Sequence, residues 1–99
     1  MTLFDERERA FEQRFVQEEA QRFRARSRRN RHLAEWACTR MGLAGRAAAA
    51  YVEAFTDAGM LARDADLAAR LRADLQGAGI EASLPELQAE MERAAAVRP

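Results

Sequence analysis

The sequence feature that most constrains the fold is a long stretch without helix-breaking residues. Residues 5–41 contain neither glycine nor proline, so the chain from Phe4 to Met41 is predicted to form one helix. Its apolar residues recur at the intervals of a single helical face. In the first half Phe4, Phe11 and Phe15 share a narrow arc, with Phe23 near its edge. In the second half the apolar residues are Leu33, Trp36, Ala37 and Met41.

The length of this helix predicts that part of it projects. About 38 residues span close to 60 Å, whereas a compact chain of about 100 residues has a radius of gyration of only about 13 Å. The first half has fewer potential partners in the sequence, so we expect it to be the half that projects. A short helix without tertiary contacts frays, but one bearing a phenylalanine stripe can anchor in a groove of another protein. A kink near residues 26–30 would instead let the stripe fold back onto the chain.

The remaining residues predict three shorter helices, over about residues 46–58, 64–78 and 84–97. Gly42, Gly59 and Gly79 are expected to end helices, and Asp64 is a candidate N-cap. Ser83-Leu84-Pro85-Glu86 has the pattern of a capping box with proline in the first turn.

Each shorter helix has an expected apolar face. The expected members are Ala47, Tyr51, Ala54, Phe55 and Ala58, then Leu67, Leu71, Leu75 and Ala78, then Leu84, Leu87, Met91 and Ala94. No stretch alternates with period two, so the predicted fold is all-α, a four-helix bundle with a long, partly projecting first helix.

Charge is distributed unevenly although the total is +0. Residues 1–21 carry −3, residues 22–40 carry +6 and residues 41–99 carry −3. Residues 22–31 leave the apolar face nearly empty, which predicts a solvated or hinge-like joint. Their six arginines suggest either a phosphate-binding patch or a basic collar for an acidic protein surface. These side chains point in most directions and no groove-reading motif accompanies them, so nucleic acid is not the expected partner.

No catalytic motif is present, so we expect neither an enzyme nor a bound cofactor or metal. The chain has one histidine and one cysteine, without the spacings of metal or nucleophile motifs. His32 is expected at the surface, Cys38 as a small semi-buried residue, and Trp36 and Tyr51 in the core with polar atoms bonded at its edge.

Localisation is predicted to be cytoplasmic. Uncharged runs such as Ala47 to Val52 are far shorter than the roughly 20 residues of a membrane span, and the acidic start is unlike a signal peptide. A single cysteine fits a reducing compartment. We therefore expect no direct insertion into a membrane.

Several motifs together resemble the zeta subunit of alphaproteobacterial F-type ATP synthases. They are the opening Phe4-Asp5-Glu6-Arg7-Glu8-Arg9-Ala10-Phe11-Glu12, then Phe15, Glu18-Glu19, Phe23, Arg28-Arg29-Asn30, Leu33, Trp36-Ala37, Gly42-Leu43, Tyr51, Ala73-Asp74, Gly79 and Ser83. The similarity covers nearly the whole chain. Two departures are the segment Ala58 to Arg63, where the family has an acidic loop, and His32, where the family has an apolar residue.

The resemblance implies an inhibitor of ATP hydrolysis. In this family a mobile N-terminal segment becomes helical as it enters the interface between catalytic α and β subunits of F1, beside the γ subunit, and blocks hydrolysis while leaving synthesis possible. Here residues 1–20, with Thr2 to Glu19 as the inhibitory element, would form that segment, and residues 21–99 would form the bundle.

The implied partners are the F1 α, β and γ subunits. The protein would bind them at the cytoplasmic face of the inner membrane, and it is expected to be a monomer when free. The expected partner-binding residues are Phe4, Asp5, Arg7, Glu8, Arg9, Phe11, Glu12, Arg14 and Phe15, with the phenylalanines as anchors and the arginines as polar contacts. A helical adaptor that binds another complex through the same stripe, without inhibiting it, remains an alternative.

Overall fold

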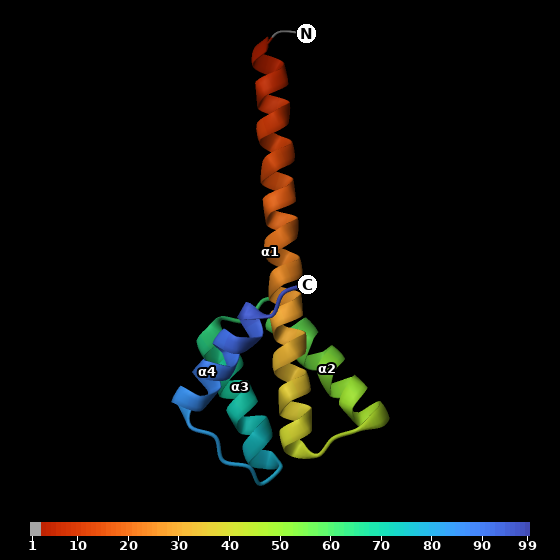
Figure 1. Cartoon of the computed structure of the whole chain (residues 1–99), viewed down its shortest axis with the longest axis vertical. Coiled ribbons are helices and arrows are strands. Elements are labelled where there is room, and N and C mark those ends of the chain that lie inside the picture. The colour runs from red at the N-terminus through yellow and green to blue at the C-terminus, as the bar shows by residue number, and fades with distance from the viewer. Residues whose placement is uncertain (1–2) are drawn as a thin grey trace.

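The computed structural model describes residues 3–99, which form four helices joined by short connections. They are α1 (Leu3–Met41), α2 (Gly45–Gly59), α3 (Asp64–Gly77) and α4 (Leu84–Ala96) (Figure 1). Residues 3–99 contain no strand. The predicted all-α fold with a long first helix is confirmed.

Helix α1 runs without a break from the bundle into solvent (Figure 1). The molecule measures 64 × 29 × 21 Å and its radius of gyration is 17.7 Å, well above the roughly 13 Å of a compact chain of this length. The projection predicted from length alone is therefore present. The alternative of a kink near residues 26–30 is wrong, because the helix passes through these residues intact.

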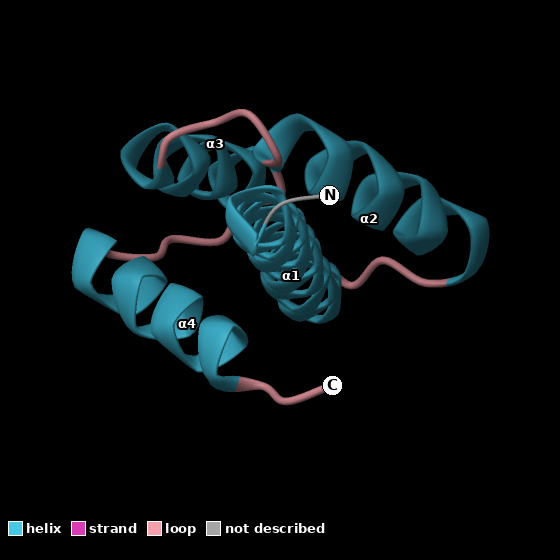
Figure 2. Cartoon of the chain, turned by 90° about the horizontal axis from the view of Figure 1, so that it is seen from above, coloured by secondary structure: helices cyan, strands magenta, loops and turns pink. Residues whose placement is uncertain are grey.

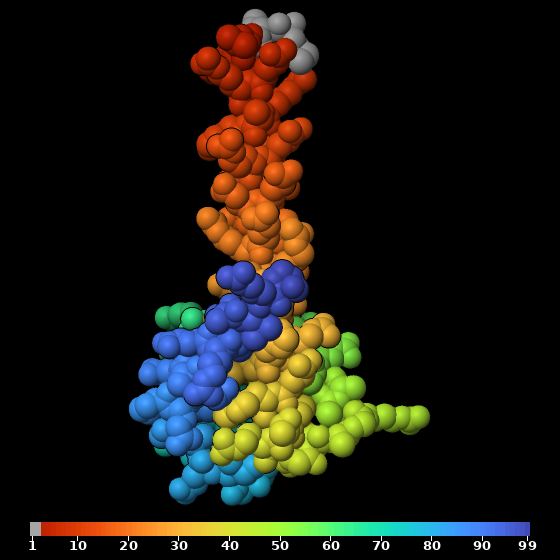
Figure 3. Space-filling model, in the orientation of Figure 1, coloured from red at the N-terminus to blue at the C-terminus, as the bar shows by residue number. Residues whose placement is uncertain are grey.

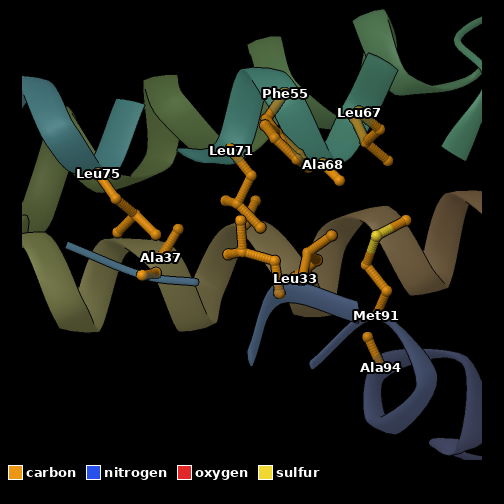
Figure 4. Close-up of a cluster of buried hydrophobic side chains, with 12 residues drawn as sticks. Leu33, Ala37, Phe55, Leu67, Ala68, Leu71, Leu75, Met91 and Ala94 are labelled. Carbon is orange, nitrogen blue, oxygen red and sulfur yellow. The ribbon is translucent and has the colours of Figure 1, made fainter. Parts of the chain in front are cut away.

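The core surrounds the C-terminal half of α1. Viewed along that helix, α2, α3 and α4 lie around it (Figure 2), and α1 contacts all three. Side chains from all four helices meet in one cluster (Figure 4). Its buried members include Leu33, Ala34 and Ala37 of α1, Phe55 of α2, Leu67, Ala68, Leu71 and Leu75 of α3, and Leu87, Met91 and Ala94 of α4.

The packed face of α2 differs from the predicted one. Tyr51 and Phe55 face the core as expected, but the three predicted alanines are exposed, namely Ala47, Ala54 and Ala58. Ala48, Val52, Thr56 and Gly59 are buried or half-buried instead. Five of the residues from Gly45 to Ala50 are alanine or glycine, so the sequence offers little contrast between the two sides of this turn. Ala78, which follows the last residue of α3, and Leu84 of α4 are also exposed rather than packed.

Several helix boundaries follow their predicted signals. Gly42 and Gly79 adopt φ of 73° and 79°, the left-handed region that glycine enters without steric cost. The Ser83 hydroxyl accepts a hydrogen bond from the Glu86 N–H at 3.2 Å, as a capping box requires. Asp64 is not an N-cap, because Arg63 takes that position and Asp64 is the first residue of α3.

The one tyrosine, the one tryptophan and the one cysteine of the chain lie at the edge of the core or inside it. Tyr51 is half-buried and its hydroxyl donates to Asp74 Oδ2 at 2.8 Å, as predicted. Trp36 is half-buried beneath the guanidinium of Arg40, 5.3 Å from the ring centroid. Cys38 is fully buried rather than semi-buried, with its Sγ 3.7 Å from the Ala48 carbonyl oxygen.

Candidate partner-binding helix

The projecting half of α1 carries large apolar side chains in water. Phe4, Phe11 and Phe15 are 74%, 72% and 56% exposed, and the space-filling view shows this half of the helix standing clear of the bundle (Figure 3). Burying a side chain of this size contributes about 1.5–3 kcal/mol. Three such side chains on one face therefore form a surface suited to a partner.

The predicted site residues separate into groups around the helix. At about 100° per residue, the three phenylalanines fall within an arc of about 40°. Glu8 and Glu12 lie about 40° and 80° to one side of Phe4, and Arg7 and Arg14 lie about 60° and 80° to the other.

The remaining predicted contacts lie farther from the stripe. Asp5 and Arg9 stand about 100° and 140° from Phe4, toward the back of the helix. Thr2, the expected start of the inhibitory element, lies outside residues 3–99. The geometry thus gathers Phe4, Arg7, Glu8, Phe11 and Phe15 on one surface, and it does not bring Asp5 and Arg9 onto it.

A buried polar cluster anchors α1 where the helix leaves the bundle. Asn30 is fully buried, and its Oδ1 accepts hydrogen bonds from Nε and Nη2 of Arg29 at 3.2 and 3.1 Å. The amide nitrogen of Asn30 is 3.4 Å from the Thr56 carbonyl oxygen. Arg29 Nη1 also pairs with Asp64 Oδ1 of α3 at 2.8 Å. These bonds tie α1 to two other helices at one level. Residues 22–26 are exposed, as the prediction of a solvated stretch requires, whereas residues 27–30 are half-buried or buried.

This cluster is not among the features predicted from the sequence. The sequence places Asn30 in the arginine-rich stretch that is expected to be solvated. Its position nevertheless carries a signal, since it lies three residues before Leu33 and seven before Ala37, both on the packed face. A fully buried amide is stable only when its polar atoms are bonded, and Arg29 and Thr56 supply those bonds.

The arginine-rich stretch is divided between different directions. Arg22 pairs with Glu19 at 2.7 Å, and Arg26 donates to the Met60 carbonyl oxygen at 3.0 Å. Arg24, Arg28 and Arg31 make no hydrogen bond or ion pair with any residue from 3 to 99. At about 100° per residue, Arg22, Arg26 and Arg29 lie on one side of the helix, and Arg24, Arg28 and Arg31 lie on the opposite side. The six side chains therefore do not form one continuous basic surface of the kind that follows a phosphate backbone.

Two kinds of feature are absent from the residues that the structure describes. Within residues 3–99, the structure brings no three histidine, cysteine or acidic side chains into an arrangement that could hold a metal ion. None of the helices described is both long and apolar enough to cross a bilayer. The distinctive surface of the molecule is the exposed phenylalanine stripe.

Comparison with known proteins places the chain in a family. No curated protein and no solved structure matches the sequence. The sequence model of one family, ATPase inhibitor subunit zeta, matches residues 1–98 of the 99-residue chain. This match agrees with the resemblance found in the N-terminal motifs. The chain belongs to the ATPase inhibitor subunit zeta family.

Proposed function

We propose that this protein is a non-enzymatic subunit that blocks ATP hydrolysis by the F1 sector of F-type ATP synthase. In this proposal the N-terminal helix inserts at a catalytic interface between α and β subunits, next to γ. The observation that carries it is the stripe of Phe4, Phe11 and Phe15, which stays exposed on a helix that stands clear of the other described residues. Membership of an ATPase inhibitor family supports the choice of partner.

The stripe supplies the driving force for insertion. All three rings are more than half exposed, so a closed interface would remove most of their surface from water. Phe11 is the central ring of the three, and central aromatic anchors dominate the energetics of many interfaces. Arg7, Arg14, Glu8 and Glu12 border the stripe and would form the polar contacts around it.

The bundle acts as the mount for the inhibitory helix. We assign residues 1–20 to the inhibitory segment and residues 21–99 to the bundle. The bonds of Asn30 and Arg29 hold α1 at the rim of the bundle, so the segment extends from a defined point. The bundle then stays outside the interface, on the cytoplasmic side of the membrane.

The proposal includes inhibition in one direction only, as the resemblance to the family implies. We therefore expect the protein to inhibit ATP hydrolysis without inhibiting ATP synthesis.

The test is a titration of isolated F1 that lacks this subunit, with ATP hydrolysis as the measurement. Full-length protein should inhibit, and a shortened chain beginning at Gln21 should not. Phe11→Ala should weaken inhibition by about 2–4 kcal/mol, or roughly 30- to 1,000-fold. Phe23→Ala is the matched control, because Phe23 is similarly exposed at 64% but lies about 120° around the helix from Phe11.

Two results would contradict the proposal. Equal inhibition by the shortened chain would show that residues 1–20 are not the inhibitory segment. Binding of full-length protein to F1 without any loss of hydrolysis would favour the alternative of a helical adaptor.

A further inference from the structure

Two charged residues sit on opposite sides of the phenylalanine stripe. Arg7 and Glu8 follow Phe4 by three and four positions and precede Phe11 by four and three. On an α-helix these spacings make all four residues neighbours on one surface. We call Phe4, Arg7, Glu8 and Phe11 the stripe diamond. All four are exposed.

Neither charge has a partner in the part of the chain that the structure describes. Among residues 3–99, Arg7 and Glu8 take part in no hydrogen bond or ion pair. A nearby stretch of the same helix shows the contrast, because Arg22 pairs with Glu19 there at 2.7 Å. The charges of the stripe diamond are therefore available to another molecule.

The local sequence does not explain these charges as support for the helix itself. The residues three and four positions from Arg7 are uncharged, namely Leu3, Phe4, Ala10 and Phe11. The charged residues at those distances from Glu8 are both acids, Asp5 and Glu12. Like charges at such spacings destabilise an isolated helix. Glu8 therefore does not stabilise the free helix, and its exposed carboxylate can contact a partner.

We infer that the stripe diamond fits a cleft whose two walls carry opposite charge, with acidic groups facing Arg7 and basic groups facing Glu8. This inference rests on the proposed function and describes the cleft of the same ATPase. Arg14 lies on the arginine side and Glu12 on the glutamate side, so the same polarity continues for about one further turn. The partner is a protein surface, since one wall is basic and the other acidic.

This polarity determines how the helix is seated. Three phenylalanines alone specify neither the direction of a helix in an apolar groove nor its exact rotation. Turning the helix end for end exchanges the sides on which Arg7 and Glu8 lie. Each charge would then face a wall of its own sign, and like-charge contacts across an interface strongly disfavour the wrong arrangement.

A charge exchange tests the inference directly. The double variant Arg7→Glu/Glu8→Arg keeps net charge and composition but reverses the polarity across the stripe. The arginine at position 8 would lie near Asp5 and Glu12, so the exchange makes the free helix more stable rather than less. We expect inhibition of F1 hydrolysis to weaken on the order of 100-fold. Undiminished inhibition by the exchanged variant would overturn the inference.

A matched pair of single variants provides the control. Glu8→Gln and Glu6→Gln make the same chemical change two positions apart, but Glu6 points about 160° away from Glu8. Glu8→Gln should weaken inhibition about tenfold or more, and Glu6→Gln should leave it within about twofold. Equal effects of the two variants would show that only net charge matters, and would also overturn the inference.

The effect of Phe11→Ala separates this inference from the proposed function. If Phe11→Ala weakens inhibition and the charge exchange does not, the helix inserts but its charges do not seat it. If Phe11→Ala has no effect, the proposed insertion itself fails.

Discussion

Gly59 of α2 lies directly against the buried amide of Asn30 in α1. A Cβ placed on Gly59 would stand 2.6 Å from Asn30 Nδ2 and 3.1 Å from Leu67 Cδ1. Gly59 is the last residue of α2, as predicted, but it ends the helix without the positive φ of Gly42 and Gly79. Its function in the fold is to let α2 approach α1 closely at the level where α1 leaves the bundle.

Substitution of this glycine should destabilise the protein. We expect Gly59→Ala to lower the free energy of unfolding by about 1–3 kcal/mol, because the added methyl group has no space beside a fully buried amide. Urea denaturation followed by circular dichroism measures the change. Gly77→Ala is the control, since a Cβ there meets nothing within 4 Å. It should be neutral or stabilise by up to about 1 kcal/mol. Equal stability of the two variants would show that α1 and α2 do not approach closely at Gly59.

Tyr51 should make stability fall in alkali. Burial, followed by the hydrogen bond to Asp74, raises the pKa of Tyr51 above its ordinary range. The unfolded chain releases this proton near pH 10, whereas the folded chain retains it. The stabilisation is therefore fully present below about pH 10 and is lost as the pH rises above that value.

Tyr51→Phe tests this dependence by urea denaturation between pH 7 and pH 11. The variant should lose about 0.5–1.5 kcal/mol at neutral pH and show a shallower decline above pH 10. Burial, and to a smaller degree Glu35, also raises the pKa of Cys38, so that thiol adds a loss of the same sign. Measurements in a Cys38→Ala background remove it. An unchanged alkaline slope in Tyr51→Phe would contradict the assignment.

The capping bond of Ser83 should contribute measurably to α4. Its hydroxyl accepts from the Glu86 N–H at 3.2 Å, so Ser83→Ala leaves that N–H without its partner. We expect a loss of about 1 kcal/mol in thermal or urea unfolding, and Ser83→Asp should restore most of it. A loss in Ser83→Ala that Ser83→Asp fails to restore would indicate a role for Ser83 other than capping.

Removal of the projecting half should leave the stability of the bundle unchanged. The ion pair between Glu19 and Arg22 links the projecting half of α1 to the rest of the chain, and both of its side chains are largely exposed. Exposed pairs of this kind contribute little to stability. A chain beginning at Gln21 should therefore unfold with a free energy within about 0.5 kcal/mol of the full-length value. A decrease of more than about 1 kcal/mol would mean that the N-terminal residues pack against the bundle in solution.

The long first helix and its exposed stripe were predictable because local rules determine both. The absence of glycine and proline over residues 5–41 and the spacing of Phe4, Phe11 and Phe15 need no knowledge of the tertiary fold. Projection followed from length alone. The capping box at Ser83 and the left-handed turns at Gly42 and Gly79 are likewise local signals.

The joint and the packed face of α2 could not be predicted in the same way, because they depend on how helices meet. An alanine-rich helix does not reveal which of its sides faces α1. Asn30 looked solvated since its bonding partners, Arg29 and Thr56, become relevant only after α2 is docked. Asp64 looked like a cap, but it begins α3 and pairs with Arg29 across 35 positions of sequence.

The residues of the candidate site were predicted from the sequence, but their arrangement around the helix was not described there. The resemblance supplied nine residues, and the helix separates them into a central stripe, two charged borders and a back that holds Asp5 and Arg9. Sequence spacing already contained that division. What the sequence lacked was proof that the helix continues unbroken from Asn30 to Phe4, which is what gives the spacing its meaning.

Because α1 is continuous, the distance of the phenylalanines from the bundle and the direction they face are coupled. Because the bonds of Asn30 fix one end and no break intervenes, the reach of the stripe and the direction it faces cannot vary independently. One residue added between Phe15 and Asn30 would advance the phenylalanines by about 1.5 Å and turn them by about 100°. Seven added residues would advance them by about 10 Å and return them nearly to their original bearing. The length of this helix therefore sets both how far from the bundle the phenylalanines are presented and toward which side.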